Sequence, residues 1–233
     1  MSGGTSNAYP RFRADPFYAW RAIRGRVLDV GGGSDPLYQF RSEFPKVTSW
    51  TVIDKSRLDK TLADLEWIVS DAGDLPPDRE FDCIYSSHCL EHVDNPTKVA
   101  GAWWDALAVG GHLIVMVPSW WTYERQEWPP KRNSDHRTAW VPARYPGDGL
   151  PPHVRGLLDV VWGVATFDLS LAVTTPRYAT GGHPDLIRLT TLDEGFDPRV
   201  FDQTAIGSCE SGIEIVIRKT SRPVITPYTE HTK

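Results

Sequence analysis

The chain has 233 residues, of which 40% are hydrophobic and 24% are charged, and its formal net charge is −5. This composition predicts one ordinary globular domain, and the negative charge disfavours nucleic acid as a partner because phosphate backbones reward clustered Lys and Arg. The three cysteines lack metal-type spacing, and no apolar run reaches the roughly 18 residues of a membrane span. We therefore expect a cytoplasmic protein with reduced thiols and no membrane partner.

The first 25 residues are predicted to form a helical segment ahead of the first strand. Residues 1–10 are polar and rich in Gly and Ser, which predicts a loose start. Pro16 suits a first helical turn, and apolar side chains with roughly helical spacing surround it, namely Phe12, Phe17, Tyr18, Trp20 and Ile23. Packing on the sheet is the expected role of this segment.

An apolar run followed by three glycines is the most informative stretch of the chain. Val27 to Val30 predicts a strand buried on both faces of a parallel sheet. Gly31, Gly32 and Gly33 then let the chain turn sharply and leave backbone N–H groups uncovered. A ligand can approach the backbone closely at this carboxyl end of the strand. The alternative is a strand-to-helix turn that binds nothing, because a glycine-rich loop alone is a weak signal.

The residues after the glycines discriminate between ligands. A dinucleotide fingerprint needs glycine where Pro36 stands, and Asp35 would repel a pyrophosphate at the start of the next helix. S-adenosylmethionine has no phosphate and carries a positively charged sulfonium and ammonium group. An acidic side chain at this position is compatible with such a ligand. Asp29, at the end of the strand, could face that ammonium. The loop therefore favours S-adenosylmethionine over NAD.

Strands and helices are predicted to alternate along the next ninety residues. Helices are expected over residues 36–44 and after Asn95-Pro96, with Gly110-Gly111 ending the second helix. Strands are expected over residues 27–30, 50–54, 67–72, 80–86 and 112–117. This order predicts an α/β fold with a doubly wound, mostly parallel sheet. A terminal strand over 207–219 and a hairpin partner over 201–206 would add an antiparallel edge and make seven strands.

Acidic residues stand at the ends of the second and third strands. Asp54 could accept hydrogen bonds from both ribose hydroxyls of a nucleoside. Asp71 could accept a hydrogen bond from an adenine amino group, while Ala72 leaves room for the ring. Solvated or loop-capping carboxylates are the alternative at both positions.

The order and spacing of these segments resemble the class I S-adenosylmethionine-dependent methyltransferases, particularly the branch with a Leu-Glu-His-Val segment after strand four. The resemblance spans about residues 26–118 and is carried by Val27–Gly33, Asp54, Ser70–Ala72, Phe81–Ser86, Leu90–Val93 and Gly110–Val115. It implies a Rossmann-like fold and S-adenosyl-L-methionine as the cofactor.

The resemblance also implies roles for single residues. Asp29 and Gly31–Gly33 would contact the methionine part of the cofactor, and Asp54 would take its ribose. Asp71 and Ala72 would flank the adenine, and Ser86 or Ser87 would lie beside the cofactor. His92, within the Leu-Glu-His-Val segment, would be structural, so no metal site is expected.

A long insertion after strand five, residues 119–196, is expected to hold the substrate. Residues 119–140 have no helical or strand period but mix aromatic, acidic and basic side chains, as functional loops do. The segment 127–136 is similar to one in methyltransferases of sugar and cell-surface polysaccharide pathways. A sugar site needs carboxylates, amides and aromatic faces, and the candidates are Trp121, Tyr123, Glu127, Trp128 and Asn133. A cap that only packs on the sheet is the alternative, and Leu157 to Phe167 could be a helix or a strand of it.

The predicted function is methyl transfer to a small molecule, with a hydroxyl of a sugar or natural product as the leading acceptor. His136 beside Asp135 is the first candidate for the base that takes the hydroxyl proton, and His88 is the second. An amine, carboxylate, protein or nucleic-acid acceptor stays open. So do a homodimer and a non-catalytic S-adenosylmethionine-binding subunit of a partner enzyme.

The predicted layout is a single methyltransferase domain, residues 1–233. Its parts are a helical segment (1–25), a cofactor-binding core (26–118), a substrate cap (119–196), C-terminal strands (197–219) and a tail (220–233).

Overall fold

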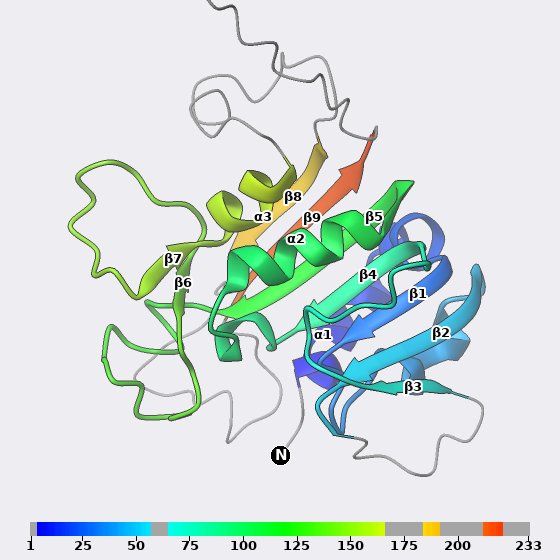
Figure 1. Cartoon of the computed structure of the whole chain (residues 1–233), viewed down its shortest axis with the longest axis horizontal. Coiled ribbons are helices and arrows are strands. Elements are labelled where there is room, and N and C mark those ends of the chain that lie inside the picture. The colour runs from blue at the N-terminus through cyan, green and yellow to red at the C-terminus, as the bar shows by residue number, and fades with distance from the viewer. Residues whose placement is uncertain (1–3, 57–64, 166–183, 192–211, 221–233) are drawn as a thin grey trace, which may run out of the picture.

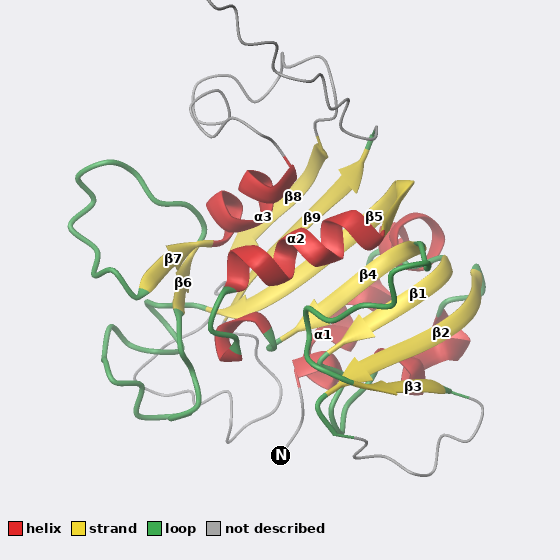
Figure 2. Cartoon of the chain, in the orientation of Figure 1, coloured by secondary structure: helices red, strands yellow, loops and turns green. Residues whose placement is uncertain are grey.

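The computed structural model describes residues 4–56, 65–165, 184–191 and 212–220. Within these ranges, seven strands form one sheet in the order β3-β2-β1-β4-β5-β9-β8 (Figure 1, Figure 2). β9 is antiparallel to β5 and β8, and the other neighbours are parallel. The strands are β1 Gly25–Val30, β2 Val47–Asp54, β3 Glu66–Val69, β4 Phe81–Ser87, β5 Leu107–Pro118, β8 Pro184–Thr191 and β9 Gly212–Lys219. The predicted α/β fold, with a mostly parallel sheet and an antiparallel edge, is confirmed.

Helices cover both faces of this sheet (Figure 1). α2 (Pro96–Ala106) and α3 (Leu157–Ala165) pack on one face, where Trp103 and Trp104 are buried among strand side chains. The other face holds α1 (Gly4–Ala14), the π-helix η1 (Tyr18–Ala22) and the 3-10 helix η2 (Leu37–Glu43). Burial on both faces explains why the central strands are apolar without alternation.

The structure corrects two predicted helix boundaries, the start of the first helix and the end of the helix after Asn95-Pro96. α1 begins at Gly4, within the stretch expected to be loose, because the Asp35 carboxylate accepts hydrogen bonds from Ser6 N (2.7 Å) and Ser6 Oγ (2.6 Å) in its first turn. α2 begins as predicted, with Asn95 Oδ1 accepting from Lys98 N at 3.0 Å. It ends at Ala106 and not at the predicted Gly110-Gly111, which lie inside β5.

The C-terminal part of the sheet also differs from the prediction. The antiparallel neighbour of β9 at the edge is β8, not residues 201–206, which lie outside the described residues. The predicted cap, residues 119–196, therefore extends too far, since β8 belongs to the main sheet. The sequence missed β8 because long-range pairing with β9 has no local signal.

The first part of the cap has a small core of its own. β6 (Ala139–Val141) and β7 (Val154–Gly156) form a two-stranded parallel sheet, and the bridge between Ser119 and Trp140 joins it to the end of β5. The core residues are Trp120, Ala139, Val141 and Val154. The stretch left open as helix or strand is the helix α3.

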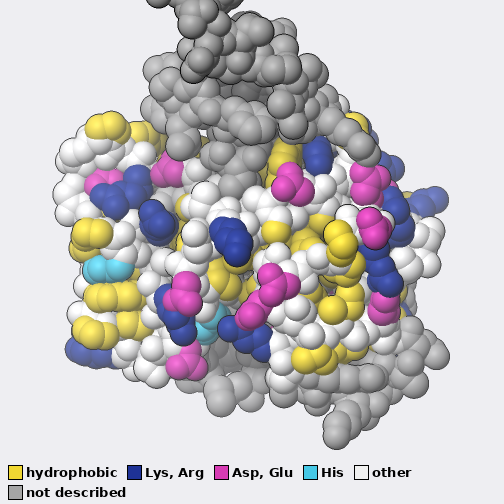
Figure 3. Space-filling model, in the orientation of Figure 1, with side chains coloured by type: hydrophobic (Ala, Val, Ile, Leu, Met, Phe, Trp, Pro, Cys, Tyr) yellow, Lys and Arg dark blue, Asp and Glu magenta, His cyan; other side chains and the backbone are white. Residues whose placement is uncertain are grey.

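The surface carries charges of both signs. On the face shown in Figure 3, acidic and basic side chains are interspersed among apolar ones. Among the described residues, no helix is both long and apolar enough to cross a membrane.

A buried ionic network fastens the N-terminal helices to the sheet. Glu214 of β9 is fully buried, and its carboxylate accepts hydrogen bonds from Arg11 Nη1 (2.7 Å) and from the Tyr18 hydroxyl. Arg11 Nη1 also donates to the Tyr18 hydroxyl at 2.8 Å. α1, η1 and β9 thus meet at one carboxylate.

Removing this carboxylate should destabilise the fold. Glu214→Ala leaves a cation and a hydroxyl under-paired, which costs about 3–5 kcal/mol of unfolding free energy for a buried pair. Glu214→Gln should cost less because the amide oxygen still accepts hydrogen bonds. Urea unfolding measures both. Equal stabilities of Glu214→Ala and wild type would show that the network does not hold the helices.

Candidate active site

The site lies where the direction of strand order reverses, at the carboxyl ends of β1 and β4. Gly31 follows β1 with φ +75°, and a Cβ there would lie 2.6 Å from Cys89 Cβ in the turn after β4. Only glycine permits this backbone and this approach. The predicted glycine turn is therefore also the place where the two central loops touch.

Asp29 lies just beneath this turn. It is 1% exposed, and its Oδ2 accepts a hydrogen bond from Leu37 N at 2.6 Å. Burial raises its pKa to about 7, with smaller increases from Asp35 and Asp54 and a partial offset by the Leu37 hydrogen bond. An ammonium group bound nearby would favour the ionised form of Asp29.

Asp54 joins the end of β2 to the glycine turn. Its Oδ2 accepts from Gly33 N at 3.1 Å, and its Oδ1 accepts from Ser56 N at 3.0 Å. Each carboxylate oxygen has further acceptor capacity, so a ribose can bind without breaking these contacts. Asp71, after β3, is exposed and pairs with Lys55 at 3.1 Å.

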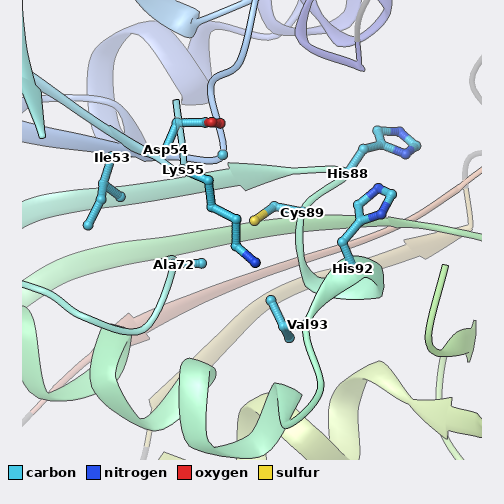
Figure 4. A pocket seen from close by; sticks show the side chains of 9 residues that line it. Ile53, Asp54, Lys55, Ala72, His88, Cys89, His92 and Val93 are labelled. Carbon is cyan, nitrogen blue, oxygen red and sulfur yellow. The ribbon is translucent and has the colours of Figure 1, made fainter. Parts of the chain in front are cut away.

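A pocket of about 570 Å³, open mouth included, connects these elements (Figure 4). Asp54 and Ala72 lie toward one end, and His88 and His92 lie at the other. The lining residues are Gly31, Ile53, Asp54, Lys55, Ala72, His88, Cys89, His92 and Val93. A second pocket shares four of these residues and adds Asp71.

The predicted cofactor residues fall around this pocket, though not all line it. Gly31, Asp54 and Ala72 line it, and Asp71 lines the neighbouring pocket. The remaining members are buried or adjacent in the same loops, namely Asp29, Gly32, Gly33, Ser86 and Ser87. Their contacts with a cofactor remain predictions.

His88 occupies the end of the pocket opposite Asp54. Its backbone has φ +53°, and its N–H donates to Met116 O at 3.0 Å. Its Nδ1 lies 3.5 Å from Oε1 of Glu91, which is fully buried. Burial disfavours the charged form of Glu91, but the imidazoles of His88, His92 and His136 outweigh it and lower the pKa of this carboxyl.

His136 is paired with a different acid from the predicted one. Its Nδ1 donates to Glu124 Oε1 at 2.5 Å, whereas Asp135 is exposed. Asn133 turns the chain, since its carbonyl accepts from His136 N (3.2 Å) and its side chain accepts from Asp135 N (3.2 Å), which leaves Asp135 facing outward. His136 is 5% exposed and stands behind the pocket wall, not in it. Burial lowers its pKa, but the Glu124 hydrogen bond and nearby acids raise it overall.

The five predicted substrate residues are dispersed over the cap. Tyr123 stacks on His136 (centroids 5.5 Å apart), Trp128 stacks on His153 (4.2 Å), and Glu127 pairs with Lys131 (3.0 Å). Trp121 is 43% exposed, and Asn133 shapes the turn described above. None of the five is among the described residues that line the two pockets. Their role toward an acceptor stays a prediction.

Sequence reasoning missed several residues of the site. Lys55, Cys89 and Val93 line the pocket, and Cys89 is kept neutral because burial raises its pKa to about 12. Their positions directly beside Asp54 and within the segment after strand four were the available signals. Glu124 gave no such signal, because its contact with His136 depends on the path of the cap.

A family model described as a methyltransferase domain matches residues 8–149. The chain belongs to this methyltransferase family. The predicted class, S-adenosylmethionine-dependent methyltransferase, is confirmed, and S-adenosylmethionine is its cofactor.

Two curated relatives and several solved structures are similar to this methyltransferase. The ubiquinone/menaquinone biosynthesis C-methyltransferase UbiE of two Vibrio cholerae strains is 30% identical over 129 residues. That match covers 50% of this chain and 49% of the relative, so the chain spans about half the length of the curated relatives it matches.

Two of the solved structures match almost the whole chain in fold. A methyltransferase in complex with the Haloferax volcanii Trm112 methyltransferase activator has a TM-score of 0.59 at 15% identity, covering 93% of this chain and 94% of that one. An S-adenosylmethionine-dependent methyltransferase from Listeria monocytogenes has a TM-score of 0.56 at 12% identity, covering 94% and 98%. At such identities the likeness supports the fold alone.

Loss of the Asp54 carboxylate should weaken cofactor binding. Asp54→Ala should raise the dissociation constant of S-adenosylhomocysteine by roughly 10- to 150-fold, which is about 1.5–3 kcal/mol for charge-assisted hydrogen bonds. Calorimetric titration measures this change. Asp71→Ala is the matched control and should lose less, because Asp71 is exposed and already paired with Lys55. Unchanged affinity in Asp54→Ala would remove Asp54 from the ribose role.

The raised pKa of Asp29 predicts a pH dependence. Affinity for S-adenosylhomocysteine should increase as the pH rises through about 7, where Asp29 ionises and can pair with the ligand ammonium. In the free protein the free energy of unfolding changes with pH in the opposite direction. The folded state holds the Asp29 proton more tightly than the unfolded state does, so the contribution of Asp29 to the free energy of unfolding falls between about pH 4 and 7. Asp29→Asn should flatten both profiles, and an unchanged slope in that variant would exclude Asp29 as their source.

Proposed function

We propose that this methyltransferase transfers the methyl group of S-adenosylmethionine to a hydroxyl of a small molecule of the sugar or natural-product class. The single observation that carries the proposal is the pocket at the carboxyl ends of β1, β2 and β4. Its Asp54 end suits a nucleoside, and the residues His88 and His92 lie at its other end. Methyl transfer to oxygen needs both a cofactor site and a group that takes the hydroxyl proton.

The proposed reaction is a single in-line displacement. The acceptor oxygen attacks the methyl carbon, the carbon–sulfur bond breaks, and the sulfonium becomes a neutral thioether as its electron pair returns to sulfur. The hydroxyl proton passes to a base. Holding oxygen, methyl carbon and sulfur in line supplies much of the rate, because the step becomes effectively unimolecular.

Two observations support His88 over His136 as this base. His88 lines the pocket, and its Nδ1 lies 3.5 Å from the buried Glu91 carboxylate, which can orient the ring. His136 is 5% exposed, and its Nδ1 is already committed to Glu124. His136 would act on the acceptor only after the wall of the pocket had moved.

A carbon acceptor is the second candidate. The relatives named UbiE are C-methyltransferases, and their similarity covers half of this chain. A panel of sugars, phenols and quinone-like rings, assayed with radiolabelled S-adenosylmethionine, distinguishes the two by the position of the label. Transfer to carbon alone would replace the oxygen proposal, and cofactor binding without turnover on any acceptor would favour the non-catalytic subunit.

His88→Ala should lower kcat by about 10²–10⁴-fold while S-adenosylhomocysteine affinity stays within a few-fold. The measurement is steady-state turnover on the acceptor identified by the panel, with calorimetry on the same preparation. His153→Ala is the matched control, because His153 stacks on Trp128 in the cap and lines neither described pocket. Normal turnover in His88→Ala would contradict the assignment of the base.

A further inference from the structure

A cluster of two histidines and two glutamates, most of them buried, adjoins the histidine end of the pocket. Glu91, His92 and His136 each offer one ligand atom, and these atoms lie within 4.8 Å of one another. Glu91 and His92 belong to the 3-10 helix η3 (Leu90–His92) after β4, whereas His136 belongs to the cap. Three such groups converge although the proposed methyl transfer uses none of them directly.

Glu91 is the centre of this cluster. It is fully buried, and within the described residues neither carboxylate oxygen accepts a hydrogen bond. Three imidazoles face Oε1 at longer range, with His88 Nδ1 at 3.5 Å, His92 Nε2 at 3.9 Å and His136 Nε2 at 4.0 Å. A buried carboxylate without hydrogen bonds is costly unless a charge compensates it.

Hydrogen bonds to Glu124 and to the Asp135 carbonyl hold the imidazoles of His136 and His92 in the tautomer that can bind a metal ion. His136 Nδ1 donates to Glu124, which is 3% exposed, so the lone pair of Nε2 faces Glu91. His92 Nδ1 lies 3.3 Å from the Asp135 carbonyl, which can only accept, so Nε2 of His92 also keeps its lone pair toward Glu91. A carboxylate or carbonyl on the far nitrogen is the usual partner of a metal-binding imidazole.

The charge of the cluster also suits a divalent cation. Two buried carboxylates, Glu91 and Glu124, stand beside these imidazoles and together carry a charge of about −2 when both are ionised. One divalent ion would balance it. Two imidazoles and one carboxylate are a known set of zinc ligands that leaves a fourth coordination position open. Imidazole ligands disfavour the binding of magnesium and calcium.

We propose that Glu91, His92 and His136 bind one divalent transition-metal ion, zinc by preference, with Glu124 positioning His136. Ligand atoms around a tetrahedral zinc ion stand about 3.4 Å apart. The present separations of 3.9 and 4.0 Å from Glu91 Oε1, and at most 4.8 Å within the set, need only small side-chain shifts.

The ion would join the cap to the cofactor-binding core. Two ligands come from the core and one from the cap, at the point where the backbone carbonyl of Glu91 already accepts from Arg137 N (2.7 Å) and Thr138 N (3.3 Å). His92 lines the pocket, so the ion would lie one side chain away from a bound acceptor. Metal binding itself does not depend on the proposed reaction.

The test uses tag-free full-length protein stripped with a chelator and titrated with Zn²⁺, without cofactor or acceptor. Wild type should bind one ion per chain by calorimetry and by elemental analysis, and Co²⁺ should give the visible absorption of a tetrahedral site. His92→Ala should abolish this binding. It is the preferred variant because His92 is partly exposed, and an unchanged circular dichroism spectrum with cooperative thermal unfolding reports that it folds. Glu124→Gln should weaken binding by about 10- to 100-fold.

His153→Ala is the matched control, as an imidazole of the cap that stacks on Trp128 outside the cluster. It should bind Zn²⁺ as wild type does. The proposal is overturned if wild type binds no stoichiometric Zn²⁺ or Co²⁺, or if His153→Ala reduces binding as much as His92→Ala. These outcomes are independent of whether methyl transfer is found.

Discussion

The close contact between the turn after β1 and the turn after β4 is the constraint on which the site depends. A side chain on Gly31 would overlap Cys89, and the φ of +75° at Gly31 is one that other residues rarely adopt. Because these turns touch, Asp54 and His88 become opposite ends of one pocket. The two apolar cores on either face of the sheet hold the strands that carry both turns.

Glu91 couples this core to the cap. Its backbone carbonyl accepts hydrogen bonds from the cap, and its buried carboxylate faces imidazoles from both parts. A single residue therefore links the orientation of His88, which lines the pocket, with the position of His136, which does not. This arrangement explains how a loop without regular structure in its first twenty residues can be held at a defined place over the pocket.

The core of this fold could be predicted because its signals are local. The apolar run into Gly31, the Asn95-Pro96 helix start and the acid that ends β2 each depend on a few neighbouring residues. The pairing of His136 with Glu124 could not, since sequence proximity favoured Asp135 and only the turn at Asn133 decides which acid faces inward. The tie between Asp35 and Ser6, which starts α1, likewise joins residues far apart in the sequence. Asp35 could be recognised from its position after the glycines, but its hydrogen bond to Ser6 could not.

A crystal structure of the complex with S-adenosylhomocysteine would show how the cofactor lies in the pocket. We expect the ribose hydroxyls on Asp54, the adenine beside Ala72, and the sulfur directed toward the end of the pocket lined by His88. A cofactor bound with its adenine at the His88 end, or outside this pocket, would contradict this arrangement.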